Sequence, residues 1–284
     1  MTSSKWTVST EWLAANLKAE NVVVVDGSKH LPTTGRDARK EFEAEHIEGA
    51  QYFDIDAIAD KSNPLPHMLP SAEQFAAQVG QMGIGNDTHV VVYDSEGMYS
   101  AGRVWWMFRT MGHETVSVVN GGLKKWKAEG RAVTGAPTLA PAARSFKATF
   151  NPARVRDAAQ VKALIGDNTV QIIDARAAAR FAGTVPEPRA GLRSGHIPSS
   201  LSLPFTTLLN ADGTLKSEAE LRAIFEAAGV DVTRPAVASC GSGVTAGAIA
   251  FALAQVGQTD AAVYDGSWSE WGARTDLPIE TGSN

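Results

Sequence analysis

The chain has 284 residues, with 26 Lys and Arg against 31 Asp and Glu, which gives a formal net charge of −5. This acidic balance makes nucleic acid a poor partner, because neutralising phosphates requires a basic surface. No apolar stretch is long enough to cross a bilayer, and the first residues lack an apolar signal core. The single cysteine, Cys240, excludes an internal disulfide framework and a multi-thiolate metal site. We therefore expect a globular protein of the reducing cytoplasm.

Short apolar runs rich in β-branched residues predict buried strands, and amphipathic segments lie between them. In chain order these runs are 22–25, 90–93, 116–119, 170–173, 235–239 and 261–264. Ser71 with Gln74, and Ser217 with Glu220, match the capping box that begins a helix. Strands that alternate with helices predict an α/β fold, with a mainly parallel sheet covered by helices on both faces. Such a sheet binds ligands at the carboxyl ends of its strands.

The landmarks of the first half recur in the second half at closely matching spacings. Asp26 and Asp174 each end an apolar run, and His46 and His196 each follow in a His-Ile turn. The same order of capping box, strand and Gly-Trp ending then repeats, so the chain contains two copies of one domain. The expected bounds are 1–135 for the first domain, 136–150 for a Pro-containing linker and 151–284 for the second domain.

Residues that recur in both halves are explained more simply by structure than by chemistry, since only one half has a thiol. We expect His46 and His196 to satisfy backbone groups at a turn, and Trp126 and Trp271 to pack in the two cores.

Cys240 follows an apolar run directly and begins the sequence C-G-S-G-V-T-A-G-A, whose last part has the composition of a helix. Gly241 and Gly243 allow the turn to fold so that successive N–H groups converge on one anion. Such a loop stabilises a thiolate and equally a persulfide anion, so Cys240 is predicted to be a nucleophile. The alternative is a buried structural cysteine. The matched position in the first half is Asp94, and that half is expected to be a structural copy that forms one wall of a cleft.

The loop C-G-S-G-V-T, the ending G-S-W-S-E-W, the two His-Ile turns and the tandem halves resemble the tandem rhodanese-fold sulfurtransferases. Within that family they are most similar to the members that use 3-mercaptopyruvate. The resemblance extends from about Trp6 to Ile279. It implies two rhodanese-like domains, the second of them catalytic, and sulfur transfer through a Cys240 persulfide with release of pyruvate. It implies no metal or organic cofactor, and a sulfur acceptor that is a thiol, with thioredoxin as a candidate, or cyanide.

The resemblance also assigns site residues. Arg180 and Arg189 correspond to the arginines that bind the donor, and an arginine fork suits a carboxylate and its neighbouring carbonyl. Ser242, His67 and Asp56 correspond to a relay beside the cysteine, unless His67 only forms a local hydrogen bond in its Pro-rich turn. The remaining substrate-binding positions implied by the family are Gly241, Gly243, Val244, Thr245 and Tyr99, of which Tyr99 has a packing aromatic as its alternative.

Three other functions stay open. A thiosulfate-using sulfurtransferase typically has cationic residues after its cysteine, where this chain has Gly241 and Ser242. A cysteine phosphatase needs an arginine at the position of Ala246. A non-catalytic rhodanese-like module that only binds partners usually lacks the cysteine altogether.

Overall fold

The computed structural model describes residues 5–139 and 141–283 and divides into two compact units. Unit 1 contains the chain up to Asp60, Leu69–Asn151 and Asn210–Leu215; unit 2 contains Lys61–Met68, Pro152–Leu209 and the chain from Lys216 onward. The division therefore does not follow one cut in the sequence. The segment at 136–150, expected to be a linker, belongs to unit 1, and its described residues include no helix or strand. Residue 140 of that segment lies outside the described residues.

Unit 1 is built around a five-stranded sheet in the order β1-β5-β4-β2-β3, in which every pair is parallel. Its strands are β1 (Thr7–Val8), β2 (Val22–Asp26), β3 (Gln51–Tyr52), β4 (His89–Tyr93) and β5 (Val116–Val119). Its helices are α1 (Thr10–Asn16), η1 (Pro32–Thr34), α2 (Ala38–Ala44), α3 (Ile55–Ile58), α4 (Ala72–Gln81), α5 (Ala101–Thr110) and α6 (Gly122–Ala128).

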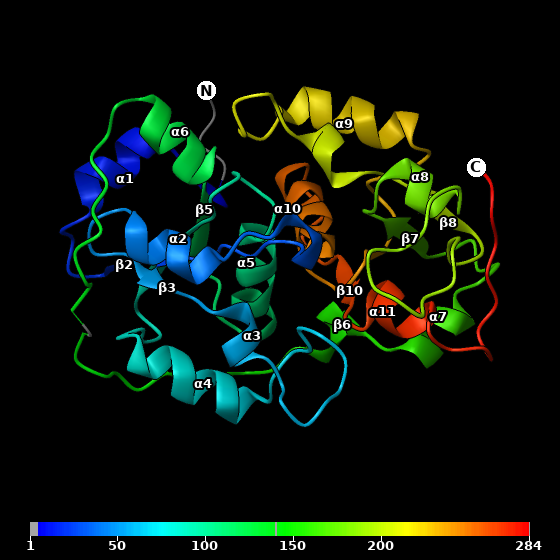
Figure 1. Ribbon diagram of the computed structural model, residues 1–284, viewed down its shortest axis with the longest axis horizontal. Coiled ribbons are helices and arrows are strands. Elements are labelled where there is room, and N and C mark those ends of the chain that lie inside the picture. Colours follow the sequence, from blue (N-terminus) through cyan, green and yellow to red (C-terminus); the bar gives the residue numbers. More distant parts are fainter. Residues whose placement is uncertain (1–4, 140, 284) are drawn as a thin grey trace. The chain divides into compact units, whose positions relative to one another are not determined.

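Helices cover both faces of the unit 1 sheet (Figure 1). Successive side chains of a strand point to opposite faces, so strands made of apolar residues need cover on both faces. On one face, residues of α1 and α6 such as Leu13 and Trp126 pack against Val24 and Val91 of the sheet. The other face carries an aromatic cluster, in which Phe75 of α4 and Phe108 of α5 meet edge to face at 5.1 Å between ring centroids. These two layers confirm the predicted arrangement.

Unit 2 repeats this topology with strand order β6-β10-β9-β7-β8, again with every pair parallel. Its strands are β6 (Val155–Arg156), β7 (Gln171–Asp174), β8 (Ser200–Ser202), β9 (Ala236–Ser239) and β10 (Ala262–Tyr264). Its helices are η2 (Pro152–Arg154), α7 (Ala158–Ala163), α8 (Ala178–Phe181), η3 (Phe205–Leu208), α9 (Glu218–Ala227), α10 (Ala246–Gln255) and α11 (Ser267–Trp271). Residues of α7 and α11 pack on one face, including Val161 and Trp271, and α10 contacts β9 and β10.

The predicted elements compare well with the observed ones. All six apolar runs form strands, and both capping boxes are present with reciprocal hydrogen bonds at Ser71 and Ser217. The paired histidines are confirmed as structural, since Nδ1 of His46 bonds the Phe42 carbonyl at 2.7 Å and Nδ1 of His196 bonds the Phe181 carbonyl at 2.9 Å. Across the described residues, none of the helices combines the length and apolar character that crossing a membrane would need.

Candidate active site

Cys240 lies at the carboxyl end of β9, on the loop that leads into α10, and only 2% of it is exposed. The segment at the start of α11 fixes this loop. The Cys240 N–H donates to Ser267 Oγ at 3.2 Å, and the Cys240 carbonyl accepts from the Trp268 N–H at 2.9 Å. The Gly241 carbonyl accepts from both the N–H and the hydroxyl of Ser269, at 2.8 and 2.7 Å. Ser267 and Ser269 were not among the predicted site residues, although they flank Trp268 in the ending G-S-W-S-E-W.

The loop after Cys240 presents backbone donors that no described residue accepts. Within residues 5–139 and 141–283, the N–H groups of Gly241, Ser242, Val244 and Thr245 donate to no protein acceptor. These four groups are called the loop amides below. Ser242, Val244 and Thr245 are nevertheless at most 8% exposed. Gly243, which lies between them, adopts the left-handed φ of 78° that the turn requires. Because buried N–H groups are almost always paired, the loop amides suit an acceptor that is not part of the backbone.

The corresponding loop of unit 1 shows what such amides bind. The Leu123 N–H donates to the Asp94 carbonyl at 2.9 Å, as Trp268 does to Cys240, so Asp94 is the structural counterpart of Cys240. The Asp94 carboxylate, in a residue only 1% exposed, accepts four backbone N–H groups at 2.6–2.9 Å, from Glu96, Gly97, Ser100 and Ala101. In unit 1 the anion at the loop is therefore a side chain of the protein itself.

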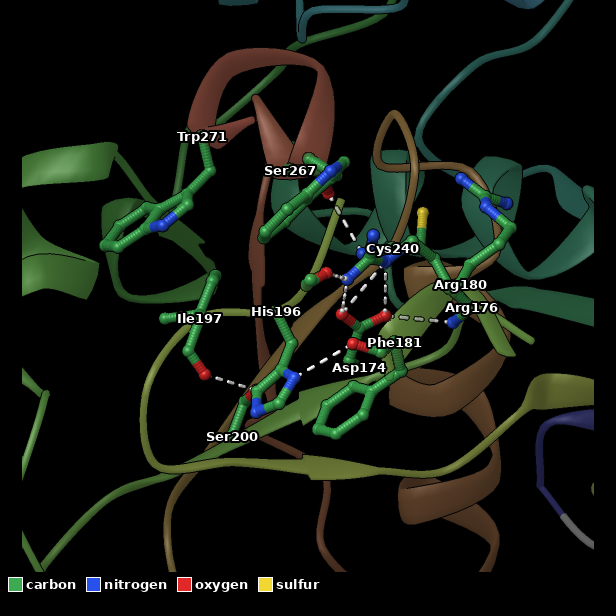
Figure 2. A network of polar contacts seen from close by, with 12 residues as sticks. Asp174, Arg176, Arg180, Phe181, His196, Ile197, Ser200, Cys240, Ser267 and Trp271 are labelled. Atoms are coloured by element: carbon green, nitrogen blue, oxygen red, sulfur yellow. Dashed lines mark hydrogen bonds and ion pairs between the residues drawn. The ribbon is translucent and has the colours of Figure 1, made fainter. Parts of the chain in front are cut away.

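The two predicted substrate-binding arginines converge on the Cys240 loop. A Cβ atom placed on Gly241 would lie 3.1 Å from Arg180 Nη2 and 3.9 Å from Arg189 Nη1, so a side chain at this position would press against both guanidinium groups. Arg189 Nη2 also donates to Ser242 Oγ at 3.3 Å. Figure 2 shows the Cys240 sulfur and the Arg180 side chain on the same side of the polar network. The structure thus brings together Cys240, Gly241, Ser242, Arg180 and Arg189.

Glu187 holds Arg180 in place. Both of its carboxylate oxygens accept from Arg180 Nε at 3.2 Å, and Oε1 also accepts from Arg176 Nη1 at 2.8 Å. Arg176 in turn donates to Asp174 at 2.7 Å (Figure 2). Its guanidinium group also lies over the Trp268 ring, with Cζ 4.1 Å from the centroid. The Glu187 side chain is 1% exposed and that of Arg176 is fully buried. Within the described chain, Nη1 of Arg180 has no protein partner, so it is able to donate to a ligand.

The other predicted site residues are placed as follows. Asp56, in α3 of unit 1, forms an ion pair with Lys29. His67, which belongs to unit 2, is buried and adopts a left-handed φ of 62°. Tyr99 is half-buried in the loop between β4 and α5 of unit 1. The relay through Ser242, His67 and Asp56 and the role of Tyr99 stay predictions.

Comparison with known proteins identifies relatives along nearly the whole chain. The family model "Rhodanese-like domain" matches twice, at residues 9–129 and 157–274. A human 3-mercaptopyruvate sulfurtransferase is 44% identical over 270 residues, which cover 93% of this chain and 91% of the relative. A bovine thiosulfate sulfurtransferase is 49% identical over 281 residues, which cover 96% and 93%. The crystal structure of SseA from Escherichia coli, described with the rhodanese fold of 3-mercaptopyruvate sulfotransferases, matches with a TM-score of 0.84 and 40% identity, covering 93% and 98%.

Proposed function

The chain belongs to the rhodanese-like family of sulfurtransferases, and we propose that it moves sulfur from 3-mercaptopyruvate through a Cys240 persulfide to a thiol acceptor or to cyanide. The observation that carries this proposal is the set of buried loop amides after Cys240 with no protein acceptor within the described residues. The Asp94 carboxylate supports it, because backbone amides of the corresponding loop of unit 1 bind that carboxylate.

In the first half-reaction, the Cys240 thiolate attacks the sulfur of 3-mercaptopyruvate. The S–S bond forms as the C–S bond breaks, and pyruvate leaves as its enolate. The thiol proton of the donor ends on the methyl carbon of pyruvate, so that Cys240 retains a persulfide anion. The loop amides stabilise this anion without reorganising, since the hydrogen bonds between the loop and Ser267 and Ser269 fix their direction.

Arg180 and Arg189 would bind the carboxylate of the donor. Both guanidinium groups lie over Gly241, next to the nucleophile, and each has N–H groups that no described residue accepts. A planar fork that binds the carboxylate and neighbouring carbonyl oxygen would orient the donor sulfur toward Cys240. In the proposed relay, Asp56 orients His67, and His67 polarises Ser242 near the donor carbonyl. The left-handed backbone of His67 supports a functional constraint there.

In the second half-reaction, an acceptor thiolate attacks the outer sulfur and releases the Cys240 thiolate, which restores the enzyme. We propose thioredoxin as a thiol acceptor, because it presents a reactive thiolate. We also propose a reducing compartment such as the cytoplasm, because Cys240 must stay unoxidised to accept sulfur.

Thiosulfate is the second candidate donor, favoured by the relative of that name at 49% identity. The structure supports the carboxylate donor instead, because the residues after Cys240 are neutral and Arg180 fills the space where a side chain of residue 241 would lie. The ratio of kcat/KM for the two donors measures the preference. We expect this ratio to favour 3-mercaptopyruvate, and a preference for thiosulfate would reassign the donor.

The Cys240→Ser variant tests the chemistry. We expect it to lose pyruvate release by at least 10³-fold, because a serine hydroxyl cannot form a persulfide. Mass spectrometry of the wild-type protein after brief incubation with 3-mercaptopyruvate should show one added sulfur that cyanide removes. Circular dichroism serves as the control for folding of the variant. Equal pyruvate release by the two proteins, or a donor-treated wild type that gains no sulfur, would contradict the proposal.

A further inference from the structure

Unit 1 has smaller side chains than unit 2 at two equivalent positions. The Ser28 N–H donates to Asp26 Oδ1 at 2.8 Å, as the Arg176 N–H donates to Asp174 Oδ1 at 2.9 Å, so Ser28 is the counterpart of Arg176. The matching backbone bonds of Leu123 and Trp268, described above, make Leu123 the counterpart of Trp268. Where unit 2 has a guanidinium stacked on an indole, unit 1 therefore has a hydroxyl and a leucine.

This difference leaves a cavity of about 580 Å³ in unit 1, at the carboxyl ends of β2 and β4. Its wall includes Asp26, Ser28, Phe42 and Leu123. Phe42 corresponds to Phe181 of unit 2, since each phenyl ring stacks on the histidine of its own half. The cavity thus occupies, in unit 1, the place that the Arg176 and Trp268 side chains fill in unit 2.

Among the carboxylates of this wall, Asp26 is the one that lacks a counter-charge; the cation Lys124 donates to the Ala211 carbonyl at 2.8 Å. Asp26 is 2% exposed, and within the described chain it forms no ion pair. Its hydrogen bonds come from Ser28 and Tyr93, and burial raises its pKa to about 6. The other carboxylates of the wall each have a cation: Glu41 and Glu96 pair with Arg36, and Glu45 pairs with Lys127. In unit 2 the equivalent carboxylate, Asp174, is paired by Arg176.

We propose that this cavity binds a small organic cation with a guanidinium or amidinium group, which pairs with Asp26 as Arg176 pairs with Asp174. The planar N–H donors match a carboxylate in two-pronged geometry. Phe42 and Leu123 provide apolar surface for the rest of the ligand. A metal ion fits less well, because no group of three or more ligating side chains occurs among the described residues. Binding at this cavity does not depend on the proposed sulfur transfer.

Calorimetric titration with ethylguanidinium, and with ethylurea as its neutral counterpart of similar shape, tests the site. At neutral pH we expect the wild-type protein to bind ethylguanidinium and not ethylurea. Asp26→Asn, which removes the charge at constant size, should weaken binding at least tenfold. The matched control Asp260→Asn changes an exposed carboxylate of unit 2 and should bind as the wild type does.

Ser28→Arg provides a second variant that does not remove Asp26. It supplies the missing guanidinium within the chain, so it should raise the melting temperature and abolish ethylguanidinium binding. Equal binding of the cation and the urea, full affinity in Asp26→Asn, or retained affinity in Ser28→Arg would each overturn the proposal. If Asp26→Asn does not fold, titration of the wild-type protein at several pH values decides. The affinity for ethylguanidinium must rise as the pH is raised through about 6, where Asp26 ionises beside Asp94 and Tyr93.

Discussion

Glu187 shows how one buried side chain can fix the geometry of the proposed donor site. It lies between Arg176 and Arg180, and the chain Asp174–Arg176–Glu187–Arg180 alternates in charge. A buried ion pair adds little net stability, because desolvation offsets the attraction, but removing one partner leaves the other buried without compensation. Glu187 therefore acts as a positioning residue that fixes Arg180 over the Cys240 loop.

Glu187→Gln should impair donor binding more than chemistry. The amide keeps the size but loses the charge that holds two guanidinium groups, so we expect the KM for 3-mercaptopyruvate to rise about tenfold with a smaller change in kcat. The free energy of unfolding should fall by about 3 kcal/mol. Steady-state kinetics and urea denaturation measure both effects. Glu218→Gln is the matched control, because Glu218 pairs with Arg222 on an exposed helix face. An unchanged KM would remove Glu187 from the donor site.

Asp26 should make the protein less stable as pH rises through the acidic range. Its pKa is about 6 in the folded protein, because burial disfavours the charge, against about 3.9 in an unfolded chain. Between these values the folded state binds more protons, so the free energy of unfolding falls as pH rises from about 4 to 6 and then levels off.

Asp26→Asn removes the free-energy cost of burying a charged carboxylate. We expect it to be more stable than the wild type by about 3 kcal/mol at pH 7, and the gain to vanish below about pH 4. Denaturant titrations over that range measure the difference, and a gain that is constant with pH would contradict the assignment.

At the scale of elements, the sequence predicts the central strands and misses the short ones. Runs such as 22–25 and 116–119 are apolar and β-branched because both faces of the sheet are covered. The strands β1, β3 and β6 have only two residues each, and β3 is Gln51–Tyr52. So short a segment shows no periodicity, and its pairing is imposed by the neighbouring strand rather than by its own composition.

The two capping boxes should contribute equally, since they begin equivalent helices of the two units. Ser71→Ala and Ser217→Ala each remove the side-chain acceptor at the start of α4 or α9. We expect each to lower the free energy of unfolding by about 1 kcal/mol. Thermal denaturation measures the effect, and Ser283→Ala, which removes an exposed hydroxyl outside any helix, is the control. A loss no larger than that of the control would show that the caps contribute nothing.

At the scale of the whole molecule, one fold occurs twice with different groups at the same position. The sequence identifies Cys240 because a cysteine before a Gly-rich turn has recognisable chemistry, and the family resemblance adds Arg180 and Arg189. It does not reveal Glu187, because the role of Glu187 depends on its contacts with Arg176 and Arg180, which form only in the folded chain. Nor does it reveal the unit 1 cavity, because this cavity results from the small side chains of Ser28 and Leu123 and not from a sequence motif.

Hydrogen–deuterium exchange should distinguish the two loops within one protein. When Cys240 carries a persulfide, the loop amides gain an acceptor, so we expect residues 241–245 to exchange more slowly after treatment with 3-mercaptopyruvate. Treatment with cyanide should reverse the change. Residues 96–101 serve as the internal control, because the Asp94 carboxylate already binds their amides. Equal protection of both loops, or none in either, would contradict the assigned role of the loop amides.

The helix behind the nucleophile has a consequence for how sulfur leaves the protein. Every residue of α10 from Ala246 to Ala254 is buried, and this helix packs on β9 and β10. Because the Cys240 loop is joined to this helix, it cannot move outward without disrupting the close packing of the interior. The Cys240 loop therefore holds the outer sulfur in a fixed position, and each acceptor must bring its nucleophilic atom to that sulfur.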